Sequence, residues 1–336
     1  MKALRLHAPG DLRLHEEPIP TPDYDQALIR VKAVGICGSD LHWAGEGTTG
    51  EAQIITPFVL GHEFSGVAEG GDLDGIRFAI DPNLPCDVCE FCLQGHPNLC
   101  PDHLFAGHPP TDGALREYMP WSMKALIPIP DTISDEDGAV LEPLGVAIHT
   151  VDLGHVKPGM IVGVYGCGPI GLLTIQVARA AGASEIFATD VLSHRLEAAK
   201  AMGANKVFLA SPEGEERTQI LSATHKLGVD VAFEVAGENS AVETAIETAQ
   251  PGGTVVLCGI PAINEIKFRA SSARRKGLTI KMVRRMKHTY PRAIKMVEAG
   301  QVDVRSIVTH RFPLEKAGEA FDLALRREGL KIIINP

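Results

Sequence analysis

Residues 160–190 carry the pattern that most restricts the fold of this chain: MIVGVYGCGPIGLLTIQVARAAGASEIFATD. The apolar run at 161–165 is typical of a buried strand, and the glycine-rich GCGPIG at 166–171 leads into an apolar helix. A second strand ends at Asp190, 19 residues after Gly171. The pattern predicts a strand–helix–strand unit whose glycine turn lets an anionic group approach the positive end of the helix.

Such a unit binds a dinucleotide when an acid follows the second strand, because the carboxylate accepts a hydrogen bond from the ribose 2'-hydroxyl. The alternative is an ordinary strand–turn–helix corner without a ligand. Asp190 would repel a 2'-phosphate, which favours NAD over NADP, whereas the nearby Arg195 can accept that phosphate. The predicted cofactor-binding residues are Gly166, Gly168, Pro169, Ile170, Gly171, Asp190 and Arg195.

Strands alternate with helical patterns beyond this unit. Strand-like runs occur at 206–210, 229–237 and 252–260, and the intervening segments have helical spacing of apolar residues. This alternation predicts an α/β, doubly wound parallel sheet. Before residue 150 the chain has short β-like runs, many prolines and frequent turns, which predict a separate, irregular β-rich lobe.

Four of the seven cysteines lie in CDVCEFCLQGHPNLC, residues 86–100. The start of the chain has no apolar leader, and no 18-residue apolar stretch occurs, so we expect a cytoplasmic protein without a membrane partner. The formal charge of -10 disfavours nucleic acid as a partner. Clustered thiols in a reducing compartment favour a structural zinc ion on Cys86, Cys89, Cys92 and Cys100, with a disulfide or an iron–sulfur cluster as alternatives.

A second group of possible ligands lies upstream. Cys37, His62 and Glu63 offer one sulfur, one nitrogen and one oxygen, which leaves a fourth position open for a catalytic zinc ion. A core cysteine beside a surface His–Glu pair is the alternative. Glycines in GICGSDLH and LGHEFSG favour the metal site, because they let the backbone bend tightly around it.

The chain resembles the zinc-containing medium-chain alcohol dehydrogenases, and within them the sorbitol (polyol) dehydrogenase branch. The resemblance rests on GICGSDLH, GHEFSG, the four-cysteine loop, DGALREY, LEPLGVAIH and GCGPIG. It implies a GroES-like β-barrel catalytic domain at 1–145, a Rossmann domain that binds NAD at 146–285, and a return to the catalytic domain at 286–336.

The same resemblance implies site roles. Glu142 would join the catalytic zinc ligands Cys37, His62 and Glu63, directly or through a water; an ordinary interdomain carboxylate is the alternative. Ser39 and His42 match the relay that carries the hydroxyl proton to solvent, although His42 can also be a plain surface histidine. The expected ions are one catalytic and one structural zinc.

Substrate preference is implied by pocket positions, namely Trp43, Phe105, His108 and Arg285. His108 replaces a small hydroxyl residue of sorbitol enzymes, which would shorten the pocket toward smaller polyols or sugars. Arg285 lies in a basic run that can equally be a solvated face.

The implied reaction is NAD-dependent oxidation of a secondary hydroxyl of a polyol or sugar alcohol to a ketone. L-threonine 3-dehydrogenase and sugar 1-dehydrogenase are alternatives, and a zinc-free reductase or structural relative is a remote one. Family members are commonly dimers or tetramers joined through the Rossmann sheet edge, for which we consider 252–260.

Overall fold

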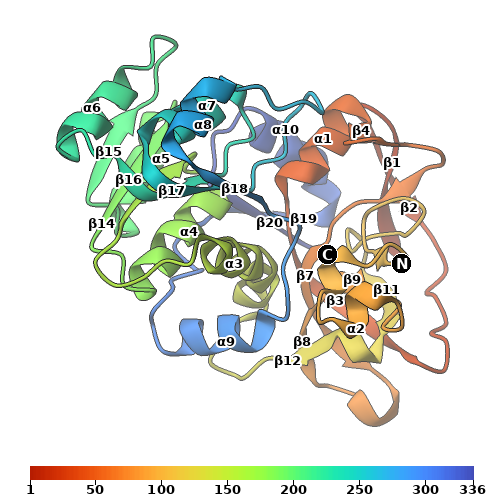
Figure 1. Cartoon of the computed structure of the whole chain (residues 1–336). Helices are drawn as coiled ribbons and strands as arrows, with labels where there is room; N and C mark the ends of the chain where they lie inside the picture. Colours follow the sequence, from red (N-terminus) through yellow and green to blue (C-terminus); the bar gives the residue numbers. More distant parts are fainter. The chain divides into compact units, whose positions relative to one another are not determined.

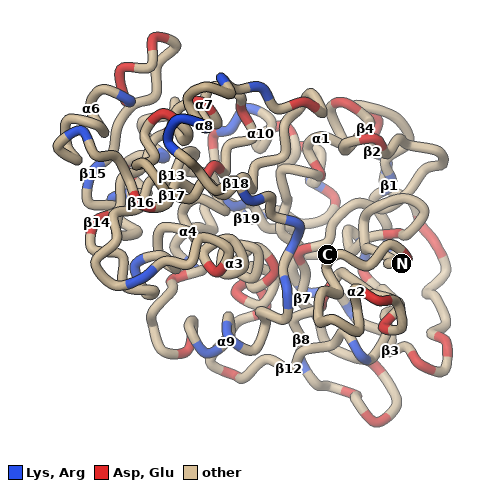
Figure 2. The backbone as a smooth tube through the Cα atoms, viewed as in Figure 1, with Lys and Arg blue, Asp and Glu red and all other residues tan.

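The computed structural model describes residues 1–336, which form two compact units. Unit 1 comprises Met1–Glu142, Tyr290–Glu298 and Val304–Pro336, and unit 2 comprises Pro143–Thr289 and Ala299–Asp303. Acidic and basic residues are interspersed along both units (Figure 2). No helix combines the length and the apolar character that crossing a membrane requires. The functional domain limits at residues 145 and 285 stay a prediction.

Unit 1 is built on a seven-stranded sheet with the order β12-β8-β7-β3-β20-β19, in which β11 also pairs with β3. The C-terminal strands therefore complete the N-terminal sheet (Figure 1). The strands are β3 (Gln26–Gly35), β7 (Glu63–Glu69), β8 (Arg77–Ile80), β11 (Tyr118–Ser122), β12 (Leu126–Pro128), β19 (Val308–Pro313) and β20 (Lys331–Asn335).

Strand β3 shows why this sheet forms. In QALIRVKAVG, buried residues alternate with partly exposed ones until the last three residues, which are all buried. The period of two places one face on the core, and the buried end carries the chain into the interior. Gly35 lies there opposite Glu63 of β7 and Ile333 of β20. The site residues thus start from the most buried part of the sheet.

Smaller elements surround the main sheet of unit 1. A three-stranded sheet has the order β2-β1-β6, and β4 and β5 form a short hairpin. The strands are β1 (Lys2–Ala8), β2 (Asp11–Glu16), β4 (Thr48–Thr49), β5 (Ala52–Gln53) and β6 (Phe58–Val59). The α-helices are α1 (Gly38–Glu46), α2 (Glu90–Leu93), α9 (Tyr290–Glu298) and α10 (Ala317–Leu325). The 3-10 helices are η1 (Gly71–Leu73), η2 (Pro97–Leu99), η3 (Met123–Ala125) and η4 (Leu314–Lys316).

Unit 2 contains a six-stranded sheet in which every neighbouring pair is parallel, with the order β15-β14-β13-β16-β17-β18. The predicted doubly wound α/β sheet is confirmed. The strands are β13 (Ile161–Tyr165), β14 (Glu185–Asp190), β15 (Lys206–Leu209), β16 (Val229–Glu234), β17 (Ala249–Leu257) and β18 (Thr279–Met282). The helices are α3 (Asp135–Gly154), which begins in unit 1, α4 (Pro169–Ala180), α5 (Ser193–Ala201), α6 (Glu215–Ala223), α7 (Asn239–Thr248) and α8 (Ala270–Lys276).

The segment 252–260 does not form a sheet edge, so that expectation was wrong. Its strand β17 lies between β16 and β18. The edge strand on this side of the sheet is β18, a four-residue strand between two basic runs, and β15 forms the opposite edge. The brevity of β18 and the flanking charges hide it in the sequence, and short charged edge strands are a common protection against unwanted pairing. A partner that extends this side of the sheet would pair with β18.

The four-cysteine loop is closed at its base by two short strands. Leu104 of β10 (Leu104–Phe105) pairs with Leu84 of β9 (Asn83–Leu84). All four sulfur atoms lie within 4.8 Å of one another, and the cysteines are free thiols. The Sγ atoms of Cys89 and Cys100 are 3.9 Å apart, close to the edge of about 3.8 Å expected for a tetrahedron with zinc–sulfur distances of about 2.3 Å. The arrangement fits the predicted structural zinc ion.

The pKa values of the thiols in this loop also favour a bound cation. N–H groups of Val88 and Cys89 lower the pKa of the Cys86 thiol to about 7, whereas burial raises the pKa of Cys92 to about 12. Crowded thiols resist joint ionisation, and a divalent ion removes that resistance because its charge stabilises every thiolate at once.

We expect Cys100→Ser to lose one zinc ion per chain and to expose the loop, because three thiolates no longer complete the shell. Metal content by atomic emission and the rate of chymotryptic cleavage within residues 86–104, where Phe91 and Leu93 are exposed, measure both effects. Cys258→Ser, which removes a half-buried thiol of unit 2, is the control. A Cys100→Ser protein with the full zinc content would contradict the assignment.

An ionic network fastens the N-terminal strands. Arg5 Nε donates to Glu17 Oε1 at 2.6 Å, and its terminal nitrogens reach Asp112 Oδ1 and Oδ2 at 3.1 and 3.0 Å. Asp112 in turn accepts the N–H of Val59 in β6. The hydrogen bond from Arg5 lowers the pKa of Glu17, although partial burial acts the other way.

A lowered native pKa means that Glu17 stabilises the fold above the ordinary pKa of a glutamate and loses this effect as the pH falls through the lowered value. We expect Glu17→Gln to cost about 1 kcal/mol of unfolding free energy at neutral pH and less in acid. Urea midpoints at both pH values measure the difference, with the exposed Glu51→Gln as control. A loss that stays constant with pH would exclude an ionic origin.

Candidate functional site

The second cluster of possible metal ligands forms at the buried end of the unit 1 sheet. Cys37 is the N-cap of α1, Glu63 is the first residue of β7, and His62 directly precedes that strand. Their sulfur, nitrogen and oxygen ligand atoms lie within 4.8 Å of one another. His62 and Glu63 are buried and Cys37 is partly buried. The structure therefore brings together three ligand types that were predicted from positions 25 residues apart in the sequence.

Asp40 organises this cluster and was not predicted. One carboxylate oxygen accepts the N–H of Cys37 at 3.0 Å, and the other accepts the N–H of Gly61 at 3.3 Å. The latter oxygen, Oδ1, also lies 3.5 Å from His62 Nδ1. A carboxylate in this place orients the imidazole and fixes which ring nitrogen is left for a metal ion. The spacing of Cys37 and Asp40 as N-cap and N3 residues was the available signal.

Glu142, in α3, is buried and belongs to the electrostatic environment of His62 and Glu63. Its pKa is raised to about 8, chiefly by burial and in part by nearby Glu63, while His62 and Lys331 act in the opposite direction. A carboxyl group so placed keeps its proton at neutral pH unless another cation is bound. Whether Glu142 contacts a metal ion directly or through a water stays a prediction.

Lys331 of β20 was also missed. Its side chain is 1% exposed, and its ammonium group forms an ion pair with Glu63 Oε2 and donates to the carbonyl oxygen of Ile36 at 2.9 Å. Burial acts to lower the pKa of Lys331, but Glu63 and Cys37 outweigh it and raise the pKa above the usual value. The lysine is therefore charged and supplies one positive charge to an acid-rich interior.

The donor set fits zinc. Cys37, Asp40, Glu63 and Glu142 are potential anions around His62 and the single ammonium group of Lys331. Buried charges are costly unless paired, and a divalent cation would balance this excess of acids. One thiolate, one imidazole and one carboxylate are the ligands of a catalytic zinc site that keeps an open position.

Residues expected to move the proton lie on α1. Ser39 and His42 are three positions apart, which places them on one side of the helix. His42 Nδ1 lies 3.3 Å from Glu46 Oε1, one turn further on. Both Ser39 and His42 are partly exposed, so solvent reaches this side of the helix.

Three of the four predicted pocket residues lie in unit 1, and each has a ring contact, Phe105 with His62 and His108 with Trp43. The rings of Phe105 and His62 are 5.3 Å apart, and the edge of His108 meets Trp43 at 5.6 Å. Trp43 is 2% exposed and also packs against Phe58, so it is part of the core as well as a neighbour of His108. Arg285 belongs to unit 2, where it is partly exposed with a φ of 54°, and its substrate role stays a prediction.

The glycine turn of unit 2 has the geometry that its sequence indicates. Gly166 has a φ of 105°, and Gly168 is the N-cap of α4 with Pro169 in the first turn. A Cβ atom on Gly171 would lie 2.0 Å from the carbonyl oxygen of Gly166, so only glycine lets the helix start this close to the strand. The helix N-terminus is left with backbone N–H groups suited to a phosphate.

Asp190 closes this turn from the second strand. Its Oδ2 accepts the N–H of Cys167 at 2.7 Å, and its Oδ1 accepts the N–H of Leu192 at 2.9 Å. Each carboxylate oxygen retains a lone pair, so the fixed carboxylate can still accept a hydrogen bond from a hydroxyl group. A terminal nitrogen of Arg195 lies 3.7 Å from the Cβ position of Gly168, which places a guanidinium beside the same turn.

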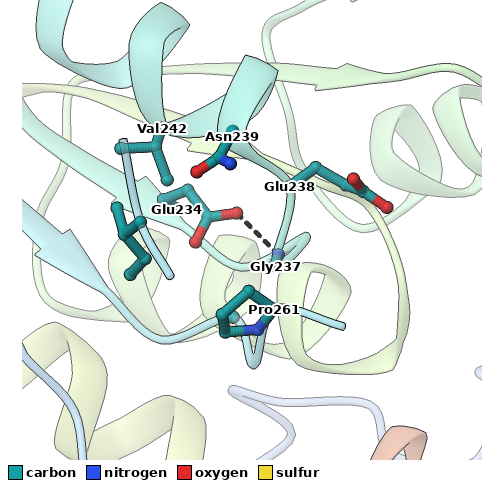
Figure 3. A pocket seen from close by; sticks show the side chains of 8 residues that line it. Glu234, Gly237, Glu238, Asn239, Val242 and Pro261 are labelled. Atoms are coloured by element: carbon teal, nitrogen blue, oxygen red, sulfur yellow. Dashed lines mark hydrogen bonds between the residues drawn. The ribbon is translucent and has the colours of Figure 1, made fainter. Parts of the chain in front are cut away.

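Glu234 at the end of β16 is a further residue that sequence reasoning missed. It accepts the N–H groups of Ala236 and Gly237 at 2.8 and 2.7 Å, and Figure 3 shows its carboxylate turned toward Gly237. Burial raises its pKa, opposed by these N–H groups. Glu234 lines a small depression in unit 2. The depression is lined by Glu234, Gly237, Glu238, Asn239, Val242, Gly259, Pro261 and Ile266.

Curated proteins similar to this chain are sorbitol dehydrogenases. That of Bacillus subtilis (strain 168) is 37% identical over 344 residues, which cover 100% of this chain and 97% of that protein. That of Homo sapiens is 39% identical over 339 residues, which cover 99% of this chain and 95% of that protein. The similarity therefore extends over both units.

Three solved structures share the fold. ECK1772 of Escherichia coli, an oxidoreductase/dehydrogenase of unknown specificity, has a TM-score of 0.93 with 31% identity over 99% of this chain and 98% of that one. A zinc-binding dehydrogenase of Sinorhizobium meliloti 1021 bound to NADP has a TM-score of 0.91 with 30% identity, covering 100% and 99%. A short chain alcohol dehydrogenase of Escherichia coli CFT073 complexed with NADH has a TM-score of 0.91 with 27% identity, covering 100% and 99%.

Two family descriptions match separate parts of the sequence. Alcohol dehydrogenase GroES-like domain matches residues 23–131, and Zinc-binding dehydrogenase matches residues 169–299. The expected combination of a GroES-like domain with a Rossmann-like parallel sheet is thereby confirmed. This chain belongs to the zinc-binding medium-chain alcohol dehydrogenase family and is one of its oxidoreductases.

Proposed function

We propose that this enzyme oxidises a secondary hydroxyl of a short polyol or sugar alcohol to a ketone, with NAD as the hydride acceptor. The observation that carries the proposal is the buried cluster of Cys37, His62 and Glu63 with Glu142 in its electrostatic environment. An oxygen-rich, polar site suits a substrate with several hydroxyl groups. Similarity to sorbitol dehydrogenases over the full chain supports the polyol class.

Each ligand residue has a stated task in this proposal. Cys37, His62 and Glu63 hold the zinc ion, Asp40 fixes the ring of His62, and Glu142 keeps a polar face toward the substrate. When bound, zinc supplies a Lewis acid that lowers the pKa of a hydroxyl group, and the nicotinamide supplies the hydride acceptor. The remaining steps depend on the protein's own residues.

Proton transfer is assigned to α1. Ser39 would accept the hydroxyl proton while passing its own proton on, and His42 would release a proton to solvent. The contact of His42 Nδ1 with Glu46 holds one ring nitrogen, which leaves Nε2 for the incoming proton. His42 is partly exposed, so a proton can pass from it to solvent. Loss of the hydroxyl proton prepares the carbon that bears this oxygen to release hydride.

NAD is the preferred cofactor in this proposal. Asp190 is held by two backbone N–H groups, so it cannot swing away from a 2'-phosphate without losing both bonds. Arg195 beside Gly168 is then assigned to the pyrophosphate. Relatives with NADP and with NADH are both known as solved structures, so the cofactor has to be measured.

We expect purified enzyme to reduce NAD with at least one of sorbitol, xylitol, threitol, erythritol and galactitol, and Cys37→Ser to abolish this activity because it removes a zinc ligand. Nicotinamide absorbance gives the initial rates, with NADP measured in parallel. Activity only with glucose or threonine would replace the polyol assignment by a sugar or threonine dehydrogenase. No activity in a zinc-loaded enzyme would overturn the proposal.

His108 is expected to limit substrate length. Its ring is nearly perpendicular to that of Trp43, with the ring centres 5.6 Å apart, and its Nδ1 lies 3.1 Å from the carbonyl oxygen of Pro109, so it is held in place by its surroundings. We expect His108→Thr to raise kcat/KM for sorbitol relative to threitol by about tenfold, which is the size of effect that small changes in pocket volume produce.

The matched control is His310→Thr, because His310 is a partly exposed histidine on β19 whose ring contacts Thr309. A ratio of kcat/KM values that stays unchanged in His108→Thr would remove His108 from the substrate pocket.

A further inference from the structure

The buried lysine of β20 is joined to a proposed zinc ligand. Lys331 and Glu63 are each 1% exposed, and the ammonium group contacts Oε2 of the carboxylate. A second bond, from Nζ to the carbonyl oxygen of Ile36 at 2.9 Å, fixes the ammonium from the residue that follows β3. The ammonium group therefore has two partners, the charged carboxylate of Glu63 and the neutral carbonyl oxygen of Ile36.

The sheet is constructed to permit this contact. Gly35 of β3 lies opposite Glu63 of β7 on one side and opposite Ile333 of β20 on the other. Lys331 precedes Ile333 by two positions and therefore points to the same face. A Cβ atom on Gly35 would lie 2.2 Å from Glu63 Oε2 and 3.1 Å from Lys331 Cε. The ion pair crosses the sheet over a residue that has no side chain.

The positive charge of Lys331 affects how the carboxylate of Glu63 can bind a metal ion. A buried lysine is costly and is retained only where an anion compensates it, and here the anion is the carboxylate that faces the ligand cluster. An ammonium group on one carboxylate oxygen leaves the other oxygen for a metal ion. It also draws electron density from the carboxylate, so the ligand neutralises less of the charge of a bound ion.

We propose that Lys331 is a positioning residue that fixes the carboxylate of Glu63 for the catalytic zinc ion. The inference rests on the proposed function, because it requires Glu63 to be a ligand. It assigns a task at the metal site to the last strand of the chain, 295 residues from Ile36.

The test compares Lys331→Met and Lys331→Arg with the wild-type enzyme. Zinc affinity is measured by competition with a chromophoric chelator, and the ligand geometry by the visible spectrum of enzyme in which Co²⁺ replaces the catalytic zinc. We expect Lys331→Met to bind zinc about 10- to 100-fold more weakly and to shift the Co²⁺ bands, which is the usual effect of losing a partner behind a ligand. Lys331→Arg, which keeps the charge, should restore most of the affinity.

A matched control separates this effect from general loss of stability. Lys276 in unit 2 is a partly buried lysine that donates to the carbonyl oxygens of Ile246, Glu247 and Ala249. Lys276→Met should therefore lower stability without moving the Co²⁺ spectrum. Gly35→Ala provides a second route, because its Cβ displaces the carboxylate from an unchanged Lys331 and should also weaken zinc binding.

Wild-type zinc affinity and an unchanged Co²⁺ spectrum in Lys331→Met would overturn the inference. If Lys331→Met does not fold, the same result in Gly35→Ala would do so. The proposed function fails on a separate result, namely that the wild-type enzyme and Cys37→Ser bind the same amount of zinc. Because that outcome is read on a chain with an intact Lys331, the two failures are distinguishable.

Discussion

The structure of the candidate metal site depends on an excess of acids inside unit 1. Asp40, Glu63 and Glu142 are buried at the end of the sheet, and Lys331 is the lysine that shares this interior. Such a cluster is stable only if the negative charge is compensated or a carboxyl group keeps its proton. The raised pKa of Glu142 favours the first arrangement, in which this carboxyl group keeps its proton. A bound divalent cation would provide the second, in which the negative charge is compensated. Zinc binding and the fold of this region are therefore linked through the same charges.

Local patterns were predicted well because their physics is local. The four cysteines and the glycine turn each lie within one continuous segment, so spacing alone fixes which atoms can meet. Lys331 could not be found in this way, since it reaches Glu63 only through the pairing of β20, β3 and β7. Asp40 was hidden for another reason, because a capping residue and a support for His62 have the same sequence signal.

Two missed elements show how packing outweighs local preference. Pro143 argues against a helix at LEPLGVAIH, yet α3 continues through it. Leu141, Leu144 and Ala147 on that helix are fully buried, and their burial offsets the backbone hydrogen bond that proline cannot make. Strand β18 was hidden between basic runs, although Lys281 within it donates to the carbonyl oxygen of Leu153 rather than facing solvent alone.

The candidate metal ligands and the proposed pocket residue His108 are located in structurally different parts of unit 1. Glu63 and Lys331 are on strands of one sheet, where a shift of one residue would turn each side chain to the other face, and His62 directly precedes the strand of Glu63. His108 is in a short turn in which its own carbonyl oxygen accepts the N–H of Thr111. A turn residue can be exchanged without moving the sheet, so a substitution at His108 can leave the candidate metal ligands in register.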